Sequence, residues 1–439
     1  MKSATRFFTL TLLLMLTPAL HAMDTYILCE GNFGSSNASL WSLDPSLTSV
    51  EGPVHWNLSD NPLGDIGQSI YIHEDLLYLV MNNSHTIEVM DLTGENPVYL
   101  ETIDVPGAGP RYMAFRDNQA YISCWNLAAV LVYDLGLGVF QDTIALDGLP
   151  EEMVFYSGHL YVAVPLTPTW DADNRVLEFM EEEGEWSLLR SHETVAGPEH
   201  LLLDGSELYV SCTYYDDAWQ AHAGTSLIDL RSNSVTNVAY GQTTNYGADL
   251  VRIGDTIYRT YQTGIAPLQD DLTIDTGAVI GDYANIYSVA AFDSLILFGL
   301  TDYVAPDEVV VTDPTGSELA TVTVGALPGS FAHHSAPVSR GESPVLPDVS
   351  RLHANWPNPF NPTTTLRYSL ESANQMILSI HDVRGALVRT LATGMMAAGE
   401  YQMTWDGLSD NGAAMPSGTY FARLRTGTEV QVRSMTLLR

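Results

Sequence analysis

A short phrase with an aromatic first residue and a mostly apolar remainder recurs along this chain. Its copies are Tyr26–Cys29, Tyr78–Met81, Tyr121–Cys124, Tyr161–Val164, Tyr209–Cys212, Tyr258–Tyr261 and, more loosely, Ile296–Gly299. A repeat at steps of roughly forty residues indicates stacked supersecondary units, because one such unit cannot bury its hydrophobic face alone. The β-branched and aromatic residues of the phrase favour strands over helices.

Every repeat has the same order of segments. A short apolar strand follows Pro or Gly, and a polar turn leads from it into the recurring phrase. A variable loop then precedes a third strand that ends in an acidic residue, and a fourth strand closes the unit. Four short antiparallel strands in each repeat are typical of the blades of a β-propeller. The innermost strands start near residues 69, 111, 152, 200, 247, 287 and 330.

The two ends of this region are expected to share one blade. The strand at 330–333 would pair with the segment Tyr26 to Trp56, which supplies the remaining strands. Sharing a blade closes the ring and removes two free sheet edges. We therefore predict an all-β chain with a seven-bladed propeller over residues 23–334, built of six complete blades and one split closing blade.

The first 22 residues read as a secretory signal peptide. Lys2 and Arg6 precede an apolar run from Phe7 to Leu16, and a small residue, Ala22, offers the cleavage site. The run is too short to span a bilayer. We therefore expect a secreted or cell-surface protein that is a monomer.

The formal net charge of −35 becomes −37 when the two basic residues of the signal peptide are removed. A surface this acidic repels phosphate backbones, so nucleic acid is excluded as a partner. The acidity serves solubility in the simpler interpretation, and attraction of divalent cations or basic partners in the alternative one.

Three cysteines in an exported chain raise the question of a disulfide. Cys29, Cys124 and Cys212 occupy the same position of the phrase in alternate repeats. Equivalent positions of non-neighbouring blades lie much farther apart than the ~7 Å that a disulfide tolerates. We therefore predict three buried thiols that pack as small hydrophobic residues.

A second module follows the propeller. Residues 335–349 are rich in Pro, Ser and Gly and are predicted to be a linker. Residues 350–439 contain alternating strands near 365–370, 376–380, 400–405 and 419–424, separated by Gly-containing turns. This length and pattern predict a small Ig-like β-sandwich.

The first module resembles the YncE-like, surface-layer-type seven-bladed propellers. The resemblance is carried by Glu30–Gly34, Pro62–Asp65, Asn82–Ser84 with Ile87–Val89, and Pro110–Tyr112. That group includes surface proteins of gut bacteria that bind cobalamin and pass it to an outer-membrane transporter. The resemblance implies the fold, and cobalamin is one ligand among several that it permits, because propellers host unrelated functions.

The second module resembles the C-terminal sorting domain of type IX (Por) secretion substrates, which overlaps the hook-capping Ig-like family. The motifs are Trp356–Pro362, His381–Gly385, Trp405–Gly407, Ser417–Tyr420 and Arg433–Arg439. The resemblance implies contact with secretion machinery and export across the outer membrane. A plain Ig-like spacer is the alternative.

One face of the predicted propeller gathers aromatic and polar residues. The loops into the innermost strands and the loops after the recurring phrase share this face. Their aromatic rings suit a small molecule, a glycan or a protein partner, and two long loops carry Trp; simple loop packing is the alternative. The candidate ligand-binding residues are Phe33, Gln68, Asn83, Arg111, Trp125, Glu152, Trp170, His200, Tyr214, Trp219, Tyr246, Tyr261 and Tyr287.

Arg111 is a prominent candidate because basic residues are scarce in this chain. It is expected to pair with Glu151 or Glu152 of the next blade, or to meet an anionic group of a ligand. The segment Asp171–Asn174 has oxygen ligands at loop spacing but lacks the Gly and distal Glu of a calcium loop.

Motifs of known catalytic centres are missing from the sequence. It has no His-Glu-x-x-His, Cys-x-x-Cys or Gly-x-Ser-x-Gly. We therefore predict a non-catalytic binding propeller with no catalytic residues, cofactor or metal. The alternatives are a propeller lyase or hydrolase that uses carboxylates at the channel mouth with His200, and a structural surface-layer component.

Overall fold

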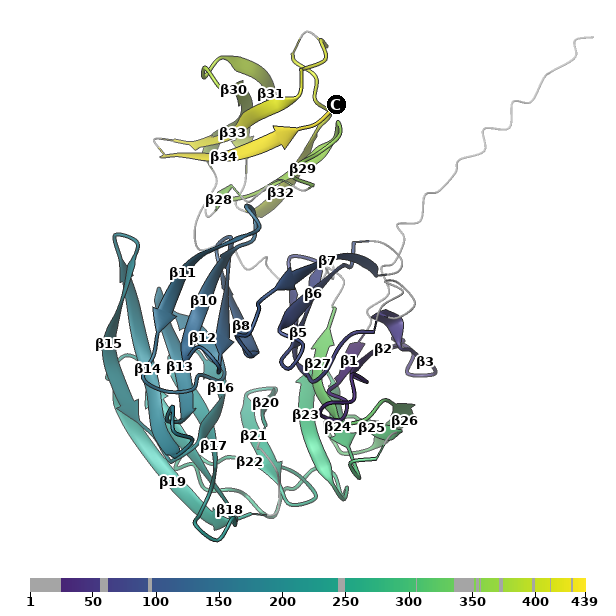
Figure 1. The fold of residues 1–439 in the computed structure, drawn as a ribbon, viewed down its shortest axis with the longest axis vertical. Helices are drawn as coiled ribbons and strands as arrows, with labels where there is room; N and C mark the ends of the chain where they lie inside the picture. Colours follow the sequence, from purple (N-terminus) through teal and green to yellow (C-terminus); the bar gives the residue numbers. More distant parts are fainter. Residues whose placement is uncertain are drawn as a thin grey trace, which may run out of the picture. The chain divides into compact units, whose positions relative to one another are not determined.

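A computed structural model gives the fold of the chain (Figure 1). It describes residues 25–55, 62–93, 97–243, 249–304, 306–334, 351–352, 355, 357–370, 374–396, 399–410, 412–427 and 429–439. The predicted signal peptide and the predicted linker lie outside these ranges. None of the described residues belongs to a helix with the length and apolar character needed to cross a membrane.

The described part of residues 25–334 forms seven antiparallel sheets, which are the blades of a seven-bladed β-propeller. The closing sheet has the order β27-β1-β2-β3, with β27 (Pro328–His333), β1 (Thr25–Cys29), β2 (Ser39–Leu43) and β3 (Val50–Glu51). The last strand of the propeller thus pairs with the first, and Thr25 faces His333 across the pair. The predicted split closing blade is confirmed.

The other blades follow in sequence order. Their strands are β4 (Gly67–His73), β5 (Leu76–Met81), β6 (Thr86–Asp91), β7 (Val98–Asp104); β8 (Pro110–Arg116), β9 (Gln119–Cys124), β10 (Ala129–Asp134), β11 (Val139–Ala145); β12 (Met153–Tyr156), β13 (His159–Leu166), β14 (Ala172–Glu182), β15 (Glu185–Glu193); β16 (Pro198–Asp204), β17 (Glu207–Tyr215), β18 (Ala221–Asp229), β19 (Ser234–Gln242); β20 (Leu250–Ile253), β21 (Thr256–Tyr261), β22 (Gly264–Pro267); and β23 (Ile286–Phe292), β24 (Leu295–Leu300), β25 (Asp307–Thr312), β26 (Glu318–Val324).

One blade departs from the prediction of six complete blades. The sheet β20-β21-β22 has three strands among the described residues. The chain after it makes only isolated bridges, between Leu268 and Ile274 and between Ile265 and Ile280. The segment 269–277 is rich in Asp, Thr and Gly, which favour turns over a continuous strand.

The recurring phrase forms the second strand of each blade, and the Tyr that opens two of its copies packs between blades. Tyr26 of β1 shares a buried cluster with Leu77 and Leu79 of the next blade. Tyr161 of β13 likewise packs with Val210 of β17. This burial of an aromatic ring at a repeated position is the hydrophobic contribution that joins one sheet to the next.

The three cysteines are confirmed as buried thiols outside any disulfide. They lie on β1, β9 and β17, in alternate blades, and their exposed fraction is zero. Burial raises the pKa of each of Cys29, Cys124 and Cys212 to about 12. They therefore behave as packing residues rather than nucleophiles.

The C-terminal module has two sheets of its own. One has the order β28-β29-β32 and the other β31-β30-β33-β34. The strands are β28 (Arg351–Leu352), β29 (Thr364–Leu370), β30 (Asn374–Asp382), β31 (Leu387–Met396), β32 (Gly399–Trp405), β33 (Gly418–Thr426) and β34 (Glu429–Leu437). Trp405 is fully buried in the core beside Phe360 and Tyr420. The predicted Ig-like β-sandwich is confirmed.

Candidate functional site

The innermost strands of the propeller surround a cavity of about 470 Å³. It is lined by Glu30, Gln68, Arg111, Tyr112, Glu151, Glu199, His200, Asp249, Tyr287, Ser288, Tyr303 and Gly329. All of these residues belong to one compact unit of the chain. Residues from every blade contribute, so the fold builds the site from positions far apart in sequence.

The same backbone irregularity directs several of these side chains to the cavity. In β4 the pairing with β5 skips Gln68, in β16 the pairing with β17 skips Glu199, and in β23 the pairing with β24 skips Tyr287. In β27 the pairing with β1 skips Gly329. Each skipped residue is the extra residue of a β-bulge at the start of an innermost strand. A bulge turns the side chains of Gln68, Glu199 and Tyr287 out of the ordinary alternation along the strand.

Arg111 and Glu151 occupy the equivalent places of two further blades. Each follows a proline at the start of its blade, as Glu199 and Gly329 do. The corresponding position of the blade β20–β22 falls in 244–248, outside the described residues. One position, repeated around the propeller, therefore supplies an amide, a guanidinium, two carboxylates and a phenol to the cavity.

Arg111 is held on three sides. Its Nη2 donates to Glu151 Oε1 at 2.6 Å, and its Nε donates to both carboxylate oxygens at 3.1 Å. Nη1 donates to Gln68 Oε1, and the guanidinium carbon lies 3.9 Å from the ring centre of Trp125. Burial lowers the pKa of Arg111, but the Glu151 carboxylate outweighs this and raises it. The predicted ion pair with Glu151 is present in the structure.

His200 lies between two carboxylates. Its Nδ1 is 3.4 Å from Glu152 Oε2 and its Nε2 is 3.8 Å from Asp249 Oδ1. Burial lowers the pKa of His200, but the hydrogen bond to Glu152 and the charge of Asp249 outweigh it and raise the pKa to about 10. The imidazole is therefore protonated at neutral pH, and it is an electrostatic partner rather than a base.

Glu30 and Glu199 differ from Glu151 and Asp249, the other carboxylates that line the cavity, because no Arg or His among the described residues pairs with them. Burial raises the pKa of each to about 7. The Tyr287 hydroxyl hydrogen-bonds to Glu30 and partly opposes that rise. Among the described residues, neither carboxylate has a cation within ion-pair distance. Burial raises the pKa of Glu151 and Asp249 as well, so what distinguishes Glu30 and Glu199 is the missing ion pair.

The structure sorts the predicted site residues into two groups. Gln68, Arg111, His200 and Tyr287 line the cavity. Glu152 and Trp125 are outside the lining but contact His200 and Arg111, respectively. Sequence reasoning left out Glu30, Tyr112, Asp249, Ser288 and Gly329, and it did not select Glu151, Glu199 or Tyr303 as binding residues. The proline that precedes Arg111, Glu151, Glu199 and Gly329 is the signal that would have identified part of this set.

The remaining predicted residues that the structure describes are not part of the cavity lining. Phe33, Trp170 and Trp219 are 78%, 62% and 82% exposed, on loops between second and third strands. Trp170 makes an edge contact with Trp125, with ring centres 5.3 Å apart. Asn83 donates to Asp65, Tyr214 stacks on His222, and the Tyr261 hydroxyl accepts from Gln262. Tyr246 lies outside the described residues.

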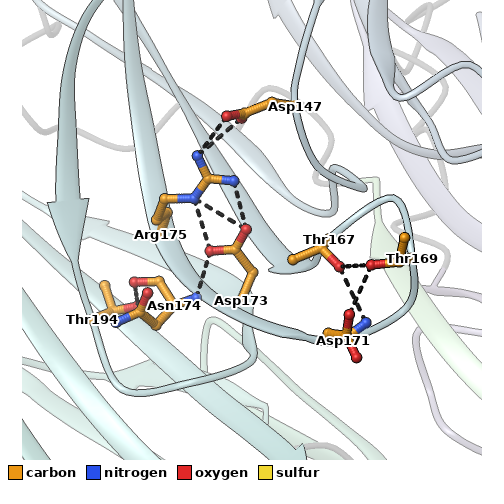
Figure 2. A network of polar contacts seen from close by, with 8 residues as sticks. All are labelled: Asp147, Thr167, Thr169, Asp171, Asp173, Asn174, Arg175 and Thr194. Atoms are coloured by element: carbon orange, nitrogen blue, oxygen red, sulfur yellow. Dashed lines mark hydrogen bonds and ion pairs between the residues drawn. The ribbon is translucent and has the colours of Figure 1, made fainter.

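The acidic segment Asp171–Asn174 is occupied by protein partners (Figure 2). Arg175 donates to both oxygens of Asp173 through Nε and reaches Asp147 through Nη1 at 2.9 Å. Asp171 instead accepts from the Thr169 hydroxyl at 2.7 Å. In Figure 2 the two carboxylates belong to separate networks. Within the part of the chain that the structure describes, no three His, Cys, Asp or Glu side chains converge as a metal site.

The fold and the cavity define a class: a seven-bladed β-propeller with a central cavity, followed by an Ig-like sandwich. Residues 361–428 match the FlgD Ig-like domain. The chain is 28% identical over 116 residues to the basal-body rod modification protein FlgD of Escherichia coli K12, a match over 25% of this chain and 50% of FlgD. The FlgD of Salmonella typhimurium gives the same figures. The chain spans about half the length of the curated relatives it matches.

Solved propeller structures are similar to the first module. A candidate 6-phosphogluconolactonase from Bacteroides fragilis superposes with a TM-score of 0.53 at 14% identity, over 72% of this chain and 99% of that protein. A second one, from Bacteroides uniformis, gives 0.53 at 15% identity over 71% and 99%. A protein from Lactobacillus plantarum gives 0.52 at 14% over 71% and 99%. At this identity the similarity shows the fold and no activity.

Proposed function

We propose that the propeller is a non-catalytic binding protein that captures a small polar molecule in its central cavity. The observation that supports this is the convergence of one repeated backbone position from several blades on a single cavity of about 470 Å³. That volume is in the range of small-molecule sites, which combine apolar or aromatic walls with a few polar groups. The proposed binding site is therefore the cavity at the innermost strands, and not the exposed aromatic loops that the sequence suggested.

The charge states of the two basic residues of the cavity favour binding over a mechanism that uses His200 as a base. His200 is charged and lies between Glu152 and Asp249, so it has no free lone pair for base catalysis at neutral pH. Arg111 is bound to Glu151 and is not available to stabilise a developing anion. A lactonase- or lyase-type enzyme is the competing proposal, suggested by the names of two structural neighbours. Turnover of lactones that is abolished by Glu152→Gln would favour it.

The binding proposal is tested by thermal unfolding of the full chain with a defined set of probes: agmatine, choline, glucose, adenosine and 6-phosphogluconate. A ligand of the native state raises the midpoint by mass action. Tyr303→Ala and Trp219→Ala form a matched pair, because both rings are exposed on loops between second and third strands. Only Tyr303 lines the cavity. We expect Tyr303→Ala to abolish the shift and Trp219→Ala to preserve it.

Two results would contradict the proposal. If Trp219→Ala removes the shift while Tyr303→Ala retains it, the exposed aromatic loops are the binding surface. If none of the five probes raises the midpoint, the central cavity does not accept a molecule of any of these chemical classes.

We also propose that residues 350–439 direct export of the propeller to the cell surface or the medium. The signal-peptide pattern at 1–22 and the separate core of the C-terminal sandwich around Trp405 support this. Deletion of 350–439 should leave a folded propeller that fails to reach the surface. Unchanged delivery would instead indicate a plain Ig-like spacer.

A further inference from the structure

We propose that the cavity takes an organic cation, with an ammonium or guanidinium group held by Glu30 and Glu199. This inference rests on the proposed binding function and specifies its ligand. It follows from which charges of the cavity already have partners within the protein and which do not.

Both cations of the cavity are already neutralised. Arg111 is bound by Glu151, whose side chain is 5% exposed. His200 lies between Glu152 and Asp249. An anionic ligand would therefore have to displace a carboxylate that is already in place. The cavity is poorly suited to phosphate or carboxylate ligands for this reason.

Glu30 and Glu199 are the two carboxylates of the cavity lining that pair with neither Arg111 nor His200. Glu30 has the neutral Tyr287 hydroxyl as its partner. No hydrogen bond or ion pair reaches the Glu199 carboxylate from the described residues. The undescribed propeller segments 56–61, 94–96, 244–248 and 305 contain no Lys, Arg or His. The propeller's own sequence thus offers these two side chains no further cation, and residues 23–334 carry 7 Arg against 45 acidic residues.

The walls of the cavity favour an organic cation over a metal ion. Tyr112, Tyr287 and Tyr303 line it, and the rings of Tyr287 and Tyr303 meet edge to face with centres 6.3 Å apart. Aromatic rings attract ammonium and guanidinium groups through their negative faces. A metal ion would need several converging ligands, and the described residues supply no such group.

Binding of a cation should release protons. The other titratable groups that line the cavity with Glu30 and Glu199 are Arg111, His200, Glu151, Asp249, Tyr112, Tyr287 and Tyr303. Since burial raises the pKa of both carboxyls to about 7, each is partly protonated at neutral pH. An entering cation favours the charged form, so we expect affinity to increase as the pH rises from 6 to 8.

The test is calorimetric titration of the full chain at pH 8 with agmatine and choline, with 6-phosphogluconate as the anionic probe and CaCl2 as the metal probe. We expect at least one organic cation to bind and 6-phosphogluconate not to bind. Glu199→Gln and Glu30→Gln, which keep the size of the side chain, should each weaken binding at least tenfold. Asp217→Asn is the matched control, because Asp217 is exposed on the same loop as Trp219 and outside the cavity lining.

The protonation readout separates a direct contact from a general loss of structure. Repeating the wild-type titration in two buffers of different ionisation enthalpy should show proton release, and Glu199→Gln should release fewer protons. Equal affinity of Glu199→Gln, Glu30→Gln and wild type would overturn the inference. So would stoichiometric binding of Ca²⁺ that is lost in Glu199→Gln.

One set of results would contradict the proposed ligand class alone, and another would contradict the proposed binding function as well. If glucose, adenosine or 6-phosphogluconate binds in a Tyr303-dependent manner and neither cation does, the cation inference is wrong and the binding proposal stands. If none of the probes binds, both are overturned.

Discussion

The Arg111 guanidinium donates to the Glu151 carboxylate of the next blade through two nitrogens, with the shortest contact 2.6 Å. Both side chains are largely buried, with exposed fractions of 16% and 5%. A buried ion pair of this kind contributes little net stability relative to an apolar pair, but loss of one partner leaves an uncompensated charge. The pair therefore organises the cavity more than it stabilises the fold.

Arg111→Met should lower the free energy of unfolding by about 3–5 kcal/mol, because it leaves the Glu151 carboxylate buried without its cation. The double variant Arg111→Met, Glu151→Met should lose much less, since both charges are removed together. Urea unfolding of the wild type and the two variants measures this. A single variant as stable as the wild type would show that Glu151 is hydrated or protonated instead.

Glu30 and Glu199 should contribute a decrease of the unfolding free energy as the pH rises from 4.5 to about 7. Glu30 and Glu199 have an ordinary pKa of 4.5 and a folded-state pKa of about 7. The native state therefore binds more protons than the unfolded state, and this stability is fully present below 4.5 and lost as the pH rises through 7. Above 6.5, His200 adds a decrease of the same sign.

The double variant Glu30→Gln, Glu199→Gln removes these two titrations. Its urea midpoint should change less between pH 5 and 6.5 than that of the wild type. An equal change in both proteins would assign the pH dependence to other groups.

The three thiols should react only after unfolding. Cys29, Cys124 and Cys212 are fully buried, and burial raises the pKa of each to about 12. Because the thiolate is the reactive form, a thiol reagent at pH 8 should label none of them in the native protein within minutes. In urea, without a reducing agent, it should label three. Fewer than three would reveal a disulfide.

Gly197→Ala should be far more destabilising than Gly205→Ala. Both glycines have positive φ angles, +71° and +60°. A methyl group at 205 meets no atom within 4 Å, so only the backbone penalty of about 1 kcal/mol applies. At 197 the added carbon would lie 1.9 Å from the Thr213 carbonyl oxygen, directly before β16. Urea midpoints compare the two, and similar losses would mean that the β16 start adjusts freely.

Asp173→Asn should cost more stability than Asp147→Asn. Both carboxylates accept from Arg175, but Asp173 is 6% exposed and Asp147 is 74% exposed (Figure 2). An exposed pair contributes about 0–1 kcal/mol, while weakening a buried charge-assisted pair costs more. Thermal unfolding of the two variants gives the comparison. A larger loss for Asp147→Asn would contradict the burial argument.

Much of the fold was predictable because it depends on local patterns that repeat. The recurring phrase marks the second strand of each blade, and its period gives the number of blades. The prediction of six complete blades was wrong at β20–β22, because turn-forming residues at 269–277 interrupt a pattern that the earlier blades complete. The turn-forming composition of this segment outweighed the tendency of the repeat to form a fourth strand.

The candidate site was predictable only in part. Arg111, His200 and Tyr287 lie where the innermost strands begin, as their sequence position suggests. Phe33 and Trp219 were selected for their aromatic character, but loop geometry leaves them exposed and outside the cavity lining. Glu30 was missed because it follows a second strand, where nothing in the local sequence indicates that its side chain reaches the centre.

The sequence by itself determined the repeat, the closing of the first strand against the last, and the separation of the three cysteines. These features depend on period and alternation, which are local properties of the chain. The tertiary structure decided which charges meet. Arg111 pairs with Glu151, His200 lies between Glu152 and Asp249, and Glu30 and Glu199 have no ion pair among the residues that the structure describes. All three arrangements depend on bulges and on contacts between blades. Those contacts join residues tens to hundreds of positions apart, and they set the local electrostatics that no spacing in the sequence encodes.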